Sequence, residues 1–209
     1  MRWADVITGS VDITIAWAPS ATKLYRAAGR TAESRTRLKV ASGAILEYLP
    51  EPLIPFAGSR FTEHLSAEVE TGGRLLSWEI LAPGRAARGE LFEYDLLGLR
   101  MELREGGSVL LRERADLRPS REKFPSLCMG GATHYGVLLA VGGDSARLEP
   151  AIREEFGAAR AGVSRLRGTG LIVKALARSH SEIQSLFGRL RDRIVRDWTC
   201  RPATVLRST

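Results

Sequence analysis

The chain has 209 residues, of which 44% are hydrophobic and 26% are charged, and this composition supplies a real core and argues against disorder. It carries 31 Lys and Arg against 24 Asp and Glu, a formal net charge of +7 that suits an anionic partner. Because the basic residues are spread along the chain, no dense basic run marks a nucleic-acid site.

The first predicted element is a strand at residues 11–17. Apolar and polar side chains alternate there with a period of two, the pattern of a half-buried strand.

The stretch 47–61, EYLPEPLIPFAGSRF, combines three prolines with large apolar residues. Proline lacks an N–H and fixes φ, so we expect neither a helix nor a central strand here. Its apolar content argues against free exposure to water. The stretch is therefore predicted to be either a rigid turn that covers the core or a docking surface.

Two hairpins are predicted next. Residues 65–69 and 76–80 alternate on either side of a Gly-Gly pair at 72–73, and a second Gly-Gly pair at 106–107 separates 101–103 from 109–111. The apolar run 137–141 indicates a further, buried strand.

Helices are predicted only near the end of the chain. Leu148, Ile152 and Phe156 recur at i, i+4 spacing, which indicates a helix over about residues 145–160. A short strand at 170–176 follows. The last helix is expected to start at an N-cap Ser181 and to run through Trp198, with one apolar stripe made of Ile183, Phe187, Leu190, Ile194 and Trp198. The pattern predicts a single domain, residues 1–209, that is mainly β and ends in two helices.

The only cysteines, Cys128 and Cys200, form no CxxC motif, so neither a disulfide framework nor a structural zinc site is indicated. We find no signal-peptide pattern and no run of about 18 apolar residues. A cytoplasmic protein without a membrane span is expected.

The three histidines, His64, His134 and His180, are far apart in the sequence and form no HExxH motif. Cys128 and His134, with Met129 between them, are the nearest approach to a soft-metal cluster. A buried cysteine beside a glycine turn is the simpler reading of the same residues. The chain also has no GxSxG motif and no phosphate-binding loop.

Four acids interrupt apolar sequence, where an unpaired carboxylate is costly: Glu47, Glu51, Glu79 and Glu90. One reading pairs Glu79 or Glu90 with Arg85 or Arg88 in partly buried salt bridges. The other places some of these acids along a hydrophilic passage, where oxygen ligands hold a divalent ion weakly. The sequence leaves both open.

Three motifs, ATKLYR at 21–26, GAILEYLPEPLIPFAGSRF at 43–61 and EILAPGRAARGELFEY at 79–94, resemble the UreD family of urease accessory proteins. The similarity continues more weakly through GVSRLRGTGLIVKAL to the last helix, and so covers nearly the whole chain. One departure is the start of the sequence. Family members usually begin with further residues that include a GGxxGGD segment, so we expect the first strands of the family to be missing here.

The resemblance implies a non-enzymatic maturation factor whose strands are stacked and helically wound. It implies a complex with UreF, the GTPase UreG and the urease structural subunits, with no nucleic acid and no membrane as partner. Nickel would pass through transiently, with no tight metal site and no permanent cofactor. The candidates for the nickel passage are Glu47, Glu51, Glu79, Glu90 and His64. The candidates for partner binding or for a structural motif are Tyr25, Arg26, Pro50, Pro52, Pro55, Phe56, Arg60 and Arg85.

Two other functions compete with this one. A small metal-dependent β-sandwich hydrolase would require His64, His134 and Cys128 to converge, since metal bonds to nitrogen or sulfur are only about 2 Å long. Nucleic-acid binding through the arginine surplus would need a sheet with interleaved aromatic residues, and the sequence lacks that pattern.

Overall fold

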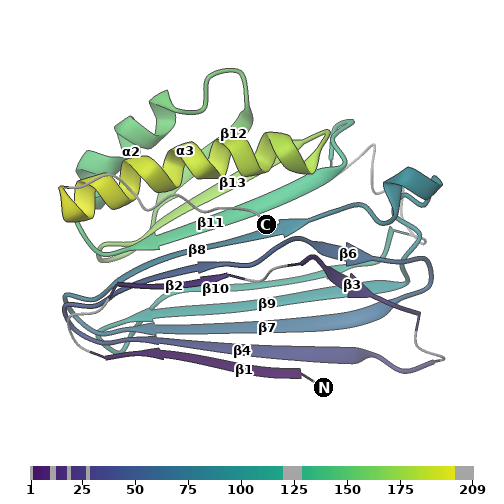
Figure 1. Cartoon of the computed structure of the whole chain (residues 1–209), viewed down its shortest axis with the longest axis horizontal. Helices are drawn as coiled ribbons and strands as arrows, with labels where there is room; N and C mark the ends of the chain where they lie inside the picture. Colours follow the sequence, from purple (N-terminus) through teal and green to yellow (C-terminus); the bar gives the residue numbers. More distant parts are fainter. Residues whose placement is uncertain (1, 10–12, 18–19, 27–28, 120–128, 201–209) are drawn as a thin grey trace.

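The computed structural model describes residues 2–9, 13–17, 20–26, 29–119 and 129–200, and its architecture is two packed β-sheets with helices on one side (Figure 1). The five-stranded sheet has the order β1 (Arg2–Thr8), β4 (Ala32–Val40), β7 (Arg60–Val69), β9 (Leu96–Glu105) and β10 (Ser108–Leu117). The eight-stranded sheet has the order β12 (Arg160–Arg165), β13 (Leu171–Ala177), β11 (His134–Val141), β8 (Arg74–Leu81), β5 (Ile45–Leu49) and β2 (Ile13–Trp17), and it also includes β3 (Thr22–Leu24) and β6 (Leu53–Pro55).

The chain winds between the two sheets. From β4 it passes to β5, then back to β7, on to β8 and back to β9, so that successive strands of each sheet run parallel. This winding confirms the expected mainly β fold of helically stacked strands.

The predicted hairpin across the Gly-Gly pair at 72–73 is wrong. Strands β7 and β8 belong to different sheets. Strand β7 pairs in parallel with β4, and β8 pairs in parallel with β5. The glycine turn carries the chain from one sheet to the other and stacks on the turn before it, where Gly43 N donates to Gly72 O at 3.2 Å. The second predicted hairpin is confirmed, because β9 and β10 pair antiparallel.

The proline-rich stretch differs from the prediction at its start. Glu47 and Leu49 lie in β5, a central strand between β2 and β8, although no central strand was expected there. The prolines themselves lie outside this ladder: Pro50 and Pro52 connect β5 to β6, and Pro55 ends β6. A missing N–H constrains only the proline that lacks it, so residues a few positions away remain free to pair.

The helices begin close to their predicted positions. Helix α2 spans Ser145–Glu154, and its N-cap Asp144 accepts hydrogen bonds from the N–H groups of Ala146 and Arg147. It ends before the predicted residue 160, and residues from Arg160 onward form β12, which the sequence did not reveal. Helix α3 spans His180–Thr199 with Ser179, and not Ser181, as its N-cap.

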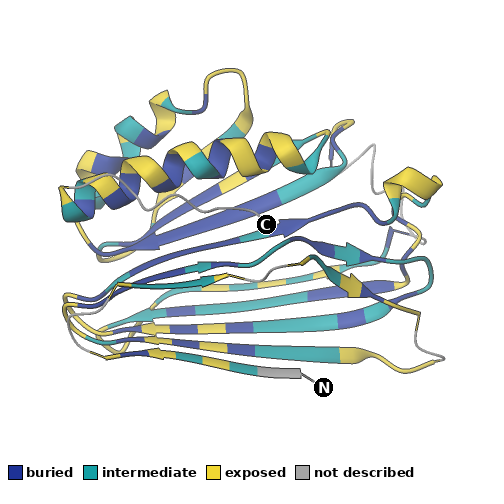
Figure 2. Cartoon of the chain, in the orientation of Figure 1, coloured by how far each residue is buried: buried dark blue, intermediate teal, exposed yellow. Residues whose placement is uncertain are grey.

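Helices α2 and α3 cover the outer face of the eight-stranded sheet (Figure 1). The predicted stripe of α3 is buried there against residues such as Leu76 and Leu138. Figure 2 shows β8 and β11 buried along most of their length, since their other face packs against the five-stranded sheet. The space between the sheets therefore holds the second part of the core, and it also holds the candidate site.

Candidate functional site

A cavity of ≈ 670 Å³ lies between the two sheets, at the end where the five-stranded sheet finishes in β10. Aliphatic and aromatic side chains form most of its wall, with a few charged groups among them. The charged residues that line it are Glu63, Glu79, Arg100, Glu113, Arg160 and Lys174.

Strand register explains how the charged groups meet. On the eight-stranded sheet Val137 of β11 is paired with Glu79 of β8 on one side and with Lys174 of β13 on the other. On the five-stranded sheet Glu63 of β7 pairs with Leu99, and Glu113 of β10 pairs with Met101, the next inward position of β9. The alternation of strand residues directs all of these side chains into the space between the sheets.

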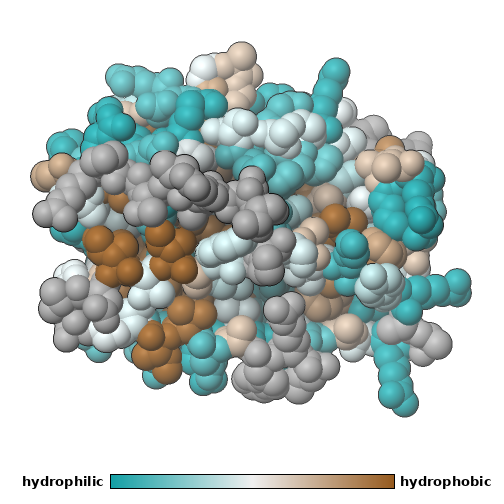
Figure 3. All heavy atoms as spheres, in the orientation of Figure 1, coloured by the Kyte–Doolittle hydropathy of each residue, from teal (hydrophilic) through white to brown (hydrophobic). Residues whose placement is uncertain are grey.

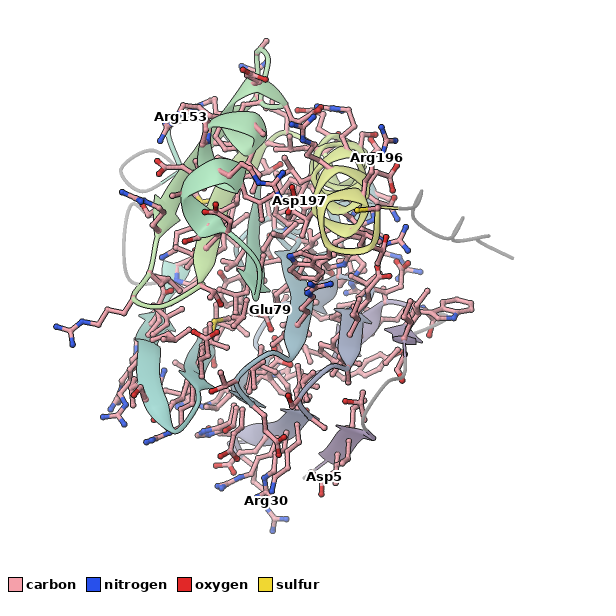
Figure 4. All side chains as sticks on the ribbon, turned by 90° about the vertical axis from the view of Figure 1, so that its left-hand side faces the viewer. Asp5, Arg30, Glu79, Arg153, Arg196 and Asp197 are labelled. Carbon is pink, nitrogen blue, oxygen red and sulfur yellow. The ribbon has the colours of Figure 1, made fainter. Side chains whose placement is uncertain are left out.

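Glu63 and Glu79 face each other across this space and share a hydrogen bond. Burial raises the pKa of Glu79 well above its ordinary value, and the charge and hydrogen bond of Glu63 and the charge of Glu113 raise it further. Part of the Glu79 surface remains accessible because it lines the cavity, but protein surrounds the carboxyl group. Figure 4 labels Glu79 in the interior, away from the surface residues Asp5 and Arg30. The two acids form a carboxyl pair that retains a proton.

The mouth of the cavity carries an ion pair between the sheets. Lys174 Nζ lies 2.5 Å from Glu113 Oε1, and both side chains are partly exposed. Tyr135 lies nearby with its pKa raised, mainly by burial and also by the charges of Glu113 and Glu79, so it stays a neutral phenol.

The two arginines of the lining are engaged by groups other than these acids. Arg100 donates to Asp116 Oδ1 at 2.5 Å and to the carbonyl oxygen of Ala115, and Arg160 donates to the carbonyl oxygen of Gly130 at 2.8 Å. The cavity is therefore an apolar chamber with a deep carboxyl pair and one ion pair at its mouth.

The residues predicted to line a nickel passage lie in separate parts of the fold. Glu79 lines the cavity, whereas Glu47 lies on the helix side of β5 in a buried ion pair with Arg191 of α3. Glu51 is partly buried in the connection between β5 and β6. Glu90 is bound by Arg85, whose guanidinium lowers the pKa of that carboxyl.

His64 lies on β7 between Glu63 and Leu65, which both point inward, so its ring is on the outer face of the five-stranded sheet. Glu63 and Glu113 are cavity residues that sequence reasoning missed. They occur in segments that carry several other charges, RFTEHLSAEV and SVLLRERADL, so neither acid stands out from the sequence. The register with β9 would have been needed to find them.

The motif residues form a separate surface cluster. Tyr25 packs edge-on against Phe56 with ring centroids 4.9 Å apart, and the Arg85 guanidinium lies 4.4 Å from the centre of the Phe56 ring. Arg26 lies against Gly58, and Arg60 is the first residue of β7.

The prolines of the motif fix the chain beside this cluster. Pro50 accepts a hydrogen bond from the Trp78 indole, and Pro52 accepts one from Thr22 N. Pro55 is buried at the end of β6. Of the cluster itself, Tyr25 remains 66% exposed, which leaves it available to a partner.

The two histidines of the alternative hydrolase lie on different faces of the fold. His64 is on the outer face of the five-stranded sheet, whereas His134 is at the start of β11 on the side that α3 covers. Cys128 lies outside the described residues, and its neighbour Met129 lines the cavity. Within the described residues, no group of three His, Cys, Asp or Glu side chains is arranged to hold a metal ion.

Hydrophobic residues gather at the left of the face shown in Figure 3, where β1 ends and β2 begins. Ile7 and Ile13 are 68% and 62% exposed, and Trp17 at the end of β2 is 50% exposed. Among the described helices, none is both long enough and apolar enough to span a bilayer.

Comparison with known proteins gives one family. The family model for the UreD urease accessory protein matches residues 14–209. The urease accessory protein UreD of Actinomyces naeslundii is 29% identical over 195 residues, which cover 90% of this chain and 71% of that protein. The UreD of Arthrobacter sp. strain FB24 is 32% identical, and the match covers 88% of this chain and 67% of that protein. The UreD of Marinobacter nauticus is 43% identical over a shorter match, which covers 60% of this chain and 43% of that protein. The chain thus spans from under half to about 70% of the length of these relatives.

Proposed function

Since this chain belongs to the UreD family of urease accessory proteins, we propose that it binds the urease structural subunits together with UreF and UreG and assists the insertion of nickel into the urease active site. Family membership makes it a maturation protein and not an enzyme. We propose that it acts in the cytoplasm, where its cysteines would stay reduced.

The observation that supports a role in nickel transfer is the cavity with its carboxyl pair. Carboxylate oxygens bind divalent cations, and a site with few fixed ligands releases them again. Of the passage candidates, Glu79 is the one we propose to contact nickel, and we add Glu63 and Glu113 because they line the same chamber. Of the other candidates, Glu47 and Glu90 are held by arginine, and His64 points away from this chamber. Glu51 lies in the connection between β5 and β6 and is not one of the lining residues.

Protein binding is supported by two exposed areas. The cluster of Tyr25, Phe56 and Arg85 presents an aromatic and a cationic group, a combination enriched at protein interfaces. Exposed Ile7 and Ile13 on the N-terminal strands offer a second, apolar area. We propose that these areas contact UreF and the urease subunits.

The test is co-production of the urease subunits with a complete set of accessory proteins, with and without this chain. We expect urease to contain much less nickel when the chain is omitted, as measured by metal analysis of the purified enzyme and by its activity. A Glu63→Gln/Glu79→Gln variant should be similarly defective. Glu68→Gln, on the exposed outer face of β7, is the matched control. Undiminished nickel content in the absence of the chain would contradict the proposed function.

A further inference from the structure

One flexible cation, Lys174, lies at the mouth of the cavity. Lys174 extends from β13 of one sheet to Glu113 on β10 of the other, and the side chains are 44% and 33% exposed. The position of Lys174 in β13, paired with Val137 and Gly162, directs its stem into the space between the sheets. Its ammonium therefore sits at the boundary between solvent and cavity.

Among the described lining residues, Lys174 is the cation that pairs with Glu113. Arg100 is fixed by Asp116 and by backbone carbonyls, and Arg160 by the Gly130 carbonyl oxygen. A partly exposed ion pair of this kind is weak, because water competes for both partners. A lysine ammonium is a point charge on a flexible stem, so it can leave Glu113 without disturbing the strands.

We propose that Lys174 is a displaceable counter-ion that controls entry into the cavity: an incoming divalent cation takes its place at Glu113 and then reaches the deeper acids. A divalent ion is attracted to the carboxylate about twice as strongly as a univalent one at the same distance, so it can compete where monovalent salt cannot. This inference rests on the proposed function, since it assigns a control element to the same cavity.

Calorimetric titration of the purified chain with nickel chloride, at low ionic strength, tests the inference. Lys174→Met removes the ammonium and keeps the aliphatic stem, and Lys39→Met is the matched control, since Lys39 is exposed on the outer face of the five-stranded sheet. We expect Lys174→Met to tighten nickel binding about fivefold, the size of one partly exposed ion pair, and Lys39→Met to leave it unchanged.

The same substitution in a Glu113→Gln background completes a double-mutant cycle. Without the Glu113 carboxylate, Lys174 and nickel no longer compete for it, so Lys174→Met should change nickel affinity by less than about twofold there. Circular dichroism of each variant verifies that the fold is kept. If wild type binds nickel and Glu113→Gln weakens it while Lys174→Met has no effect, the role of Lys174 is overturned and the cavity function stands. If neither wild type nor Lys174→Met binds nickel, the proposed nickel function of the cavity falls as well.

Discussion

At the scale of single residues, the carboxyl pair is the most unusual part of this molecule. Glu63 and Glu79 come from different sheets and meet within hydrogen-bonding distance in a mostly apolar chamber. Two ionised carboxylates so close repel each other, and so one of them keeps its proton. Under the proposed function, cation binding at this pair would release the proton.

The pair predicts a specific pH dependence of stability. In the unfolded chain Glu79 titrates near 4.5, and in the folded protein its pKa is higher, so the folded state binds more protons in between. Its contribution to stability is therefore fully present below 4.5 and is lost as the pH rises through the raised pKa. Glu79→Gln mimics the protonated acid, so its advantage in melting temperature over wild type should grow from about pH 5 to about pH 8.

The salt-bridged acids act with the opposite sign. Arginine partners lower the pKa values of Glu102 and Asp116, so their contribution is lost as the pH falls. Comparing wild type with Glu79→Gln at each pH cancels that common background. Glu68→Gln on the outer face of β7 should show no such trend. A difference between wild type and Glu79→Gln that is equal at both pH values would contradict the assignment.

Of the three cavity acids, the sequence could identify Glu79 but not Glu63 and Glu113. Glu79 stands out because LLSWEIL is apolar on both sides of it. Glu63 and Glu113 are each surrounded by other charges, so their inward direction follows only from the register with β9. Glu47 also stands out in apolar sequence, yet its partner is Arg191, 144 residues away, and no local pattern specifies that contact.

At the scale of elements, helix α3 is attached to the eight-stranded sheet by both packing and charge. Its apolar stripe covers β8, β11 and β13, and Arg191 reaches Glu47 on β5 through two hydrogen bonds that are almost completely buried. At the end of the helix, the Trp198 indole donates to Gly142 O at 2.8 Å.

Breaking the buried ion pair on one side should be costly. Arg191→Met leaves the Glu47 carboxylate without its partner in the core, and we expect a loss of about 3–5 kcal/mol of unfolding free energy. Glu47→Leu should cost a similar amount. The double variant leaves no buried charge and should recover most of the loss, which urea denaturation of all four proteins would measure. If the two single losses simply add in the double variant, the two residues do not act as a pair.

The arrangement of elements shows where sequence reasoning reaches its limit. Alternation with a period of two identifies β7 and β8 as strands. The same pattern is expected whether the two strands pair in a hairpin or lie in different sheets. The turn between β9 and β10 also contains two glycines, and there the strands do pair with each other. Which strands pair depends on contacts with strands that are distant in the sequence.

At the scale of the whole molecule, the winding of the chain produces the chamber. Each passage from one sheet to the other keeps the two sheets facing, and where the five-stranded sheet ends at β10 the eight-stranded sheet continues through β13 and β12. The lining there includes the small residues Ala115 of β10 and Gly162 of β12, which leave the space open. The proposed function thus depends on free volume as well as on carboxylates.

Filling that volume should stop nickel transfer without removing any charged group. Ala115→Trp places an indole in the chamber from β10, next to the Glu113–Lys174 pair, and we expect the nickel content and activity of co-produced urease to fall about tenfold while the variant still copurifies with its partners. Ala158→Trp, at an exposed position between α2 and β12, is the matched control and should support normal maturation. Because the indole is inserted at a site that is already hollow, the variant should fold, and a melting curve verifies this. Normal nickel content with a folded Ala115→Trp variant would show that nickel does not need this chamber, and the carboxyl pair would then be only a structural feature of the core.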